Sequence, residues 1–68
     1  MTQTVLATIK TIQAEREEKN ILPCYAMYRR DLLSCFSKKE LDKALKELIE
    51  WEVIRVGRTM NDWYIEVL

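Results

Sequence analysis

The chain has 68 residues, and its 11 basic residues balance 11 acidic residues to give a net charge of zero. A chain of this length forms one domain, residues 1–68, with a small core. The balanced charge lacks the basic excess that nucleic-acid-binding domains usually carry. There is no His, and two Cys cannot complete a four-ligand zinc site. We therefore expect no metal, no cofactor and no enzymatic activity.

The chain carries no predicted targeting segment. Residues 1–6, MTQTVL, have neither the basic region nor the apolar stretch of a signal peptide. The longest near-apolar run, residues 21–28, is far shorter than the roughly 20 residues that cross a membrane. Cys24 and Cys35 lack metal-binding spacing, so we expect them to be reduced and buried as small apolar groups. These features predict a cytoplasmic protein that binds no membrane.

The first predicted helix runs from residue 2 to about residue 19. Its apolar side chains recur at helical spacing and form one stripe: Val5, Leu6, Ile9 and Ile12. Residues 15–19 are all charged and are expected to form a solvated end, which includes Arg16. Asn20 suits the end of the helix.

Two further helices are predicted in the middle of the chain. After a linker at residues 21–23, Tyr25, Tyr28 and Leu32 follow helical spacing, which predicts a short helix ending near residue 33. Ser37 lies three residues before Glu40, which is a capping box, and Phe36 and Leu41 provide the matching hydrophobic staple. The third helix therefore begins at residue 38 and runs to residue 50 or 51.

The C-terminal residues change to a period of two, which is typical of strands. Residues 59–62 have turn character, so we predict a β-hairpin in which Arg58 and Trp63 close a four-residue loop. The resulting register is coherent on both faces: Val56 lies opposite Ile65, Ile54 opposite Val67, Arg55 opposite Glu66, and Tyr64 over Gly57. Trp51 and Trp63 are expected to pack in the core or at its edge.

Residues 37–58, SKKELDKALKELIEWEVIRVGR, resemble the winged helix-turn-helix family. They contain a capped helix with a small-Leu pair, then Leu-Ile and a strand that opens on Ile. The resemblance covers essentially the whole chain and implies an α+β fold, a small winged helix in which three helices are followed by a two-stranded antiparallel β-hairpin wing. Many members have a Gly at the end of the third helix, where this chain has Glu52.

The resemblance makes the third helix the recognition helix, which DNA-binding members place in a major groove. Its lysines at 39, 43 and 46 point away from the expected core. The expected contacts with double-stranded DNA are made by Lys38, Lys39, Lys43, Lys46, Arg58, Arg29 and Arg30. Because this face lacks Arg, Asn and Gln, we expect contacts dominated by phosphates and sensitive to salt.

Two other functions were weighed against DNA binding. The spacing of Asp42 and Lys46 allows an ion pair within the helix, so the lysines are also compatible with an ordinary solvated face. The alternative function is a protein-interaction or homodimerisation module, with an interface at Tyr64, Leu68 and Val53. Catalysis is disfavoured because the candidate carboxylates are predicted to be helix-surface charges: Asp31, Asp42 and Glu47.

Overall fold

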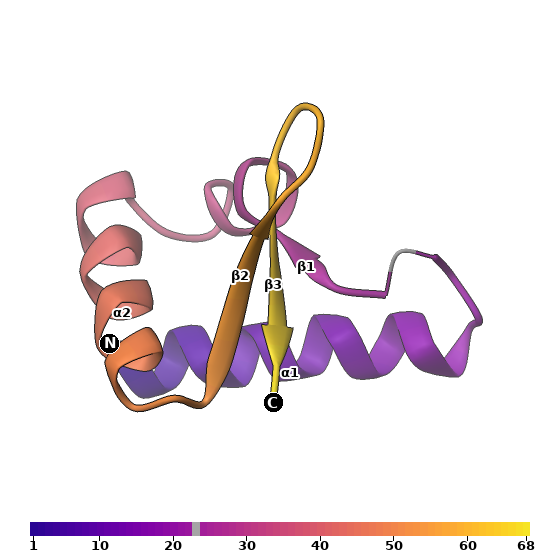
Figure 1. Cartoon of the computed structure of the whole chain (residues 1–68), viewed down its shortest axis with the longest axis horizontal. Helices are drawn as coiled ribbons and strands as arrows, with labels where there is room; N and C mark the ends of the chain where they lie inside the picture. Colours follow the sequence, from indigo (N-terminus) through magenta and orange to yellow (C-terminus); the bar gives the residue numbers. More distant parts are fainter. Residues whose placement is uncertain (23) are drawn as a thin grey trace.

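A computed structural model describes residues 1–22 and 24–68 of the chain. Its elements are α1 (Thr2–Glu18), β1 (Ala26–Met27), the π-helical turn η1 (Tyr28–Leu32), α2 (Lys38–Glu50), β2 (Ile54–Arg58) and β3 (Trp63–Val67). In Figure 1, α1 runs along the base, α2 stands at its N-terminal end, and the β2–β3 hairpin rises across the middle. The first and third predicted helices are confirmed to within two residues at their ends. The linker residue Pro23 lies outside the described part of the chain.

The sheet has three antiparallel strands in the order β1-β3-β2. The prediction of three helices followed by a two-stranded wing is therefore wrong, whereas the α+β class is confirmed. Ala26 pairs with Ile65 and Met27 with Tyr64, so a strand occupies part of the predicted second helix. A strand of two residues is too short to show an alternating pattern in the sequence, and its pairing partners lie near the other end of the chain. The strand was therefore invisible to local sequence patterns.

The β2–β3 hairpin has the predicted register. Val56 pairs with Ile65, and Arg55 pairs with Glu66 through a salt bridge of 2.6 Å. Tyr64 lies directly over Gly57, and its ring occupies the space that a Cβ atom would need. The hairpin residues therefore divide between an inner apolar face and an outer face that carries the ion pair.

The core lies between the two α-helices and the inner face of the sheet. Ser37 caps α2 by accepting the backbone N–H of Glu40 at 3.3 Å, as predicted, which orients the apolar side of α2 inward. Fully burying a large aliphatic side chain stabilises a fold by roughly 1.5–3 kcal/mol. The buried residues are Val5, Ile9, Ala26, Leu32, Leu41, Ala44, Leu45, Leu48, Ile54 and Ile65.

Arg16 joins α1 to the segment that contains β1 and η1. Its guanidinium donates to the carboxylate of Asp31 at 2.8 Å and to the carbonyl oxygen of Tyr25 at 2.7 Å. The other oxygen of Asp31 accepts the backbone N–H of Met27 at 2.7 Å. The Arg16 and Asp31 side chains are only 18% and 14% exposed. The expectations of a solvated Arg16 and a surface Asp31 are therefore wrong, because both hold β1 in place.

Both α-helices end with a residue in the left-handed conformation. Asn20 has φ 56° and Glu52 has φ 60°. In each case two backbone hydrogen bonds close a Schellman motif; after α2 they run from Val53 to Leu48 and from Glu52 to Ile49. Asn20 is the expected helix end, and Glu52 holds the conformation for which glycine is preferred.

Replacing Glu52 with Gly is expected to stabilise the protein. The left-handed conformation costs a residue with a Cβ about 1–2 kcal/mol, and Gly avoids this cost. Gly also raises the conformational entropy of the unfolded chain, which offsets part of the gain in stability. We expect the free energy of unfolding to rise by about 0.5–1 kcal/mol relative to Glu52→Ala, a control that also removes the carboxylate. Urea denaturation measures the difference, and equal stabilities of the two variants would contradict the assignment.

Replacing Gly57 with Ala is expected to destabilise the protein by about 1–3 kcal/mol, because the new methyl group collides with Tyr64. In a Tyr64→Ala background, the same change should cost far less, since the space above Gly57 is then open. Thermal unfolding of the two single variants and the double variant measures this coupling. Equal costs of Gly57→Ala in both backgrounds would refute the contact.

Candidate nucleic-acid interface

The outward side of α2 carries the row of lysines predicted from the sequence. Leu41, Leu45 and Leu48 are buried, and the opposite side of the helix exposes a separate set of residues. Because α2 stands at one end of the molecule, this side is open to a large partner (Figure 1). The exposed residues of the row are Lys39, Lys43 and Lys46, followed by Glu50.

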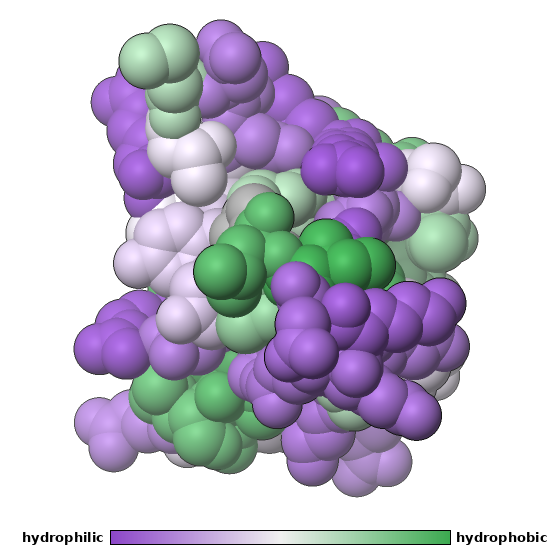
Figure 2. Space-filling model, turned by 90° about the vertical axis from the view of Figure 1, so that its right-hand side faces the viewer, coloured by the Kyte–Doolittle hydropathy of each residue, from purple (hydrophilic) through white to green (hydrophobic). Residues whose placement is uncertain are grey.

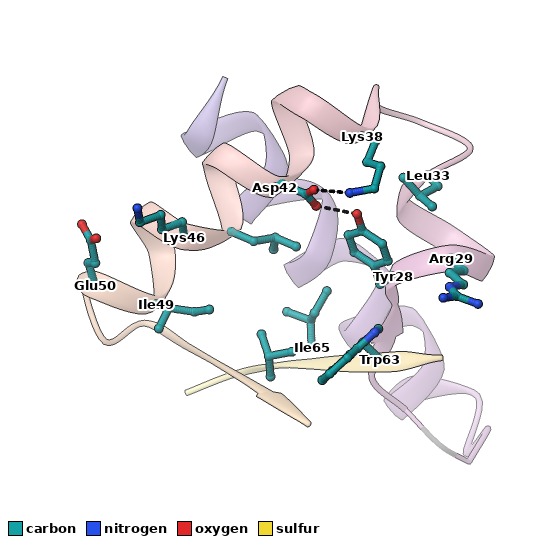
Figure 3. A pocket seen from close by; sticks show the side chains of 12 residues that line it. Tyr28, Arg29, Leu33, Lys38, Asp42, Lys46, Ile49, Glu50, Trp63 and Ile65 are labelled. Atoms are coloured by element: carbon teal, nitrogen blue, oxygen red, sulfur yellow. Dashed lines mark hydrogen bonds and ion pairs between the residues drawn. The ribbon is translucent and has the colours of Figure 1, made fainter. Parts of the chain in front are cut away.

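Lys38 differs from the other lysines because its charge is compensated within the molecule. Its ammonium group lies 2.7 Å from a carboxylate oxygen of Asp42, and the hydroxyl of Tyr28 donates to the other oxygen (Figure 3). The hydrogen bond from Lys38, together with that from Tyr28, lowers the pKa of Asp42 below its ordinary value. Asp42 is thus paired with Lys38 instead of Lys46, the partner that the sequence analysis weighed.

A groove of about 730 Å³ lies between α2 and the inner face of the hairpin. Its floor is apolar, and Figure 3 shows Ile49, Ile65 and Trp63 directed into it from α2 and β3. Arg29 and Lys46 lie among the charged residues that line it. The groove therefore combines an apolar floor with charged groups of both signs, since Asp42 and Glu50 line it as well.

Asp62 binds the end of the hairpin to η1. Its carboxylate accepts the backbone N–H groups of Arg29 at 2.8 Å and Arg30 at 3.1 Å, and also that of Trp63 at 2.7 Å. Burial raises the pKa of Asp62, but the hydrogen bonds from these three donors lower it by a larger amount. The pKa of Asp62 therefore lies below its ordinary value. The sequence around Asp62 predicts only a turn, because nothing local indicates that its carboxylate caps a helical turn.

The hydrogen bonds of Asp62 bring two predicted DNA-contacting arginines together. Arg29 and Arg58 both line a hollow at the end of the hairpin. The Arg58 guanidinium carbon lies 5.5 Å from the centre of the Trp63 ring, which holds it by a cation–π contact. Arg30 is exposed on the same helical turn as Arg29.

Exposed cations lie on α2, η1 and the hairpin of a molecule whose net charge is zero, and acidic residues lie among them. Lys46 borders both the lysine row and the groove, while Arg29 borders the groove and the hollow at the hairpin end. We call Lys39, Lys43, Lys46, Arg29 and Arg58 the cationic face. Acidic residues also border this face: Lys43 lines a hollow with Glu40 and Glu47, and Glu50 lines the groove with Lys46. The acidic residues at positions 15, 17 and 18 lie at the far end of α1, remote from α2 in Figure 1.

The residues proposed for an alternative interface occupy different environments. Tyr64 is half-buried beneath Tyr25, with ring centres 5.2 Å apart, and Val53 packs against the core. Leu68 is 65% exposed, and its N–H binds the carbonyl oxygen of Val53. Figure 2 shows further apolar patches among hydrophilic surface, on the side of the molecule that is at the right in Figure 1.

Two expectations about burial are wrong. Trp51, the residue that follows α2, is 52% exposed, and Trp63 is 40% exposed beside the groove. Cys24 is half-buried as a free thiol, whereas Cys35 is an exposed free thiol after η1. Large or soft side chains therefore remain accessible at several places outside the core.

In the part of the chain that the structure describes, no helix has the length and apolar character to cross a membrane. Within residues 1–22 and 24–68, no group of three or more His, Cys, Asp or Glu side chains is arranged to hold a metal ion. No protein-family model, curated protein or solved structure matches the chain.

Stability is expected to fall in acid because the pKa values of Asp31 and Asp62 are lowered in the folded protein. For Asp31, burial raises the pKa, but the hydrogen bonds from Arg16 and Met27 lower it by a larger amount, and the same balance holds for Asp62. The contribution of both groups is complete above the unfolded pKa of about 3.9 and is lost as pH falls through the lower folded values.

This dependence can be measured by urea denaturation between about pH 2 and pH 7. The Asp62→Asn variant should be less stable at pH 7 and should lose less stability on acidification than the unmodified chain. Parallel pH profiles for the two proteins would contradict the role assigned to Asp62.

Proposed function

We propose that the protein is a small, non-enzymatic DNA-binding protein, a transcription regulator or accessory factor that works like members of the winged helix-turn-helix family. The observation that carries the proposal is the cationic face, which gathers lysines and arginines from α2, η1 and the hairpin at zero net charge. A cytoplasmic location belongs to the same proposal, since the thiols of Cys24 and Cys35 are free, as is usual in a reducing compartment.

The dimensions of α2 suit a major groove. Its 13 residues give a helix roughly 20 Å long, which fits a groove about 12 Å wide. Lys39, Lys43 and Lys46 would then lie along the major groove of the DNA, near its phosphates. Arg29 and Arg58 would contact the DNA backbone beside that groove. Lysine is a flexible point charge, so this arrangement favours affinity over base recognition.

A second candidate function, binding to another protein, is supported by the apolar floor of the groove. Ile49 is 48% exposed although it lies beside buried residues of α2, and Trp63 is exposed at the same site. Exposed apolar side chains in a groove with a charged rim are typical of protein interfaces.

The double variant Lys39→Ala/Lys43→Ala tests DNA binding. We expect its affinity for a labelled duplex to fall roughly tenfold at about 50 mM salt. The slope of the logarithm of affinity against the logarithm of salt concentration should become shallower by about two, which corresponds to two lost phosphate contacts. The matched control is Lys10→Ala/Lys19→Ala, which removes two exposed charges from α1 and should retain more of the affinity. Fluorescence anisotropy provides both measurements.

Two results would contradict the proposal. One is the absence of binding by the unmodified chain at low salt. The other is an equal loss of affinity in the two double variants, because that would show dependence on net charge alone and not on the cationic face.

A further inference from the structure

β2 is an outer strand of the sheet, and two hydrogen bonds fix the direction of its backbone groups. Leu68 donates to Val53 at 3.0 Å at one end of the hairpin, and Thr59 donates to Asp62 at 2.8 Å at the other. Antiparallel strands exchange hydrogen bonds at every second residue. Arg55 and Gly57 therefore bond to β3, while the residues between and beside them direct their N–H and C=O groups to the open edge. These edge residues are Ile54, Val56 and Arg58.

The open edge is bordered by apolar surface. A hollow beside it is lined by four apolar residues and two charged ones: Ile49, Ile54, Val56, Leu68, Glu52 and Arg55. Ile49 is 48% exposed and Leu68 is 65% exposed. The edge has neither Lys nor Pro, two residues that protect outer strands from pairing. Its two charged side chains have partners within the hairpin, since Arg55 is bound to Glu66 and Arg58 lies over the Trp63 ring.

We propose that two copies of the chain associate through this edge, with the two β2 strands antiparallel about a two-fold axis at Val56. In that register Val56 of one copy lies opposite Val56 of the other, and Ile54 of each copy lies opposite Arg58 of the other. The edge N–H and C=O groups of all three residues then find partners. A two-fold contact must be self-complementary, and this register satisfies that condition with the strand alone. The product is a continuous six-stranded sheet.

Charge complementarity favours a second copy as the occupant. Arg58 of the second copy lies opposite Ile54, beside the hollow that Glu52 and Ile54 line together. Glu52 lies in the turn before β2, and its long side chain and that of Arg58 meet at this hollow in the paired sheet. The symmetry forms the Glu52–Arg58 pair twice. An unrelated extended peptide would supply the backbone bonds but not this reciprocal pair of charges.

Pairing of the β2 edges does not require DNA, although Arg58 belongs both to this contact and to the cationic face. It would place two cationic faces in one particle, which extends the contact available to a small domain. Because the pairing needs no DNA, its failure leaves the role of Lys39 and Lys43 untouched.

Sedimentation equilibrium without DNA tests the pairing between about 5 and 500 µM protein, the range in which a small interface associates. We expect a reversible dimer. Glu52→Arg and Arg58→Glu should each raise the dissociation constant at least about tenfold, because each places like charges together. The double variant should return to within about threefold of the unmodified chain, since the exchanged charges again form opposite pairs.

Glu50→Arg is the matched control, because it makes the same charge change on α2 outside the strand edge and should leave the dimer intact. Circular dichroism confirms that each variant is folded. A second readout is hydrogen exchange at the Val56 amide, which should slow as protein concentration rises. The proposal is overturned by a chain that stays monomeric throughout, by a double variant no stronger than the single variants, or by a dimer with an unprotected Val56 amide.

Discussion

The ion pair between Arg16 and Asp31 is the constraint on which the rest of the structure depends. It crosses from α1 to the following segment, and the same two side chains bind the backbone at Tyr25 and Met27. A mostly buried ion pair contributes only when its remaining hydrogen-bonding groups are satisfied, and here backbone groups complete the set. The pair therefore fixes where the chain leaves α1, and so the position of β1 against β3.

The cationic face follows from that position. With β1 paired to β3, η1 begins beside the hairpin, where Asp62 caps its backbone N–H groups. This brings Arg29 near Arg58 and sets η1 across the groove from α2, where Tyr28 joins the Lys38–Asp42 pair. Elements that are separate in the sequence thus contribute exposed cations to the cationic face. The acidic residues that balance these charges lie partly near the end of α1 and partly beside the cationic face, at Glu40, Glu47 and Glu50.

The sequence predicts those parts of the fold that local patterns determine. The capped start of α2, the end of α1 at Asn20 and the hairpin register all depend on residues close together in the chain, and all are confirmed. β1 was missed because its pairing is long-range, and the roles of Arg16 and Asp62 were missed because each carboxylate or guanidinium reaches a distant backbone. For the site, helical spacing alone gave the exposed lysines. The groove and the neighbouring arginines required the folded chain.

The most direct measurement of the central claim is a residue-by-residue NMR titration of the labelled protein with duplex DNA at low salt. The account predicts shifts of the amides on the outward side of α2, in η1 and at the hairpin end, reversed by added salt. Residues 15–18 at the far end of α1 should remain unchanged. Shifts centred on the end of α1, or none on α2, would contradict the claim that the cationic face binds DNA.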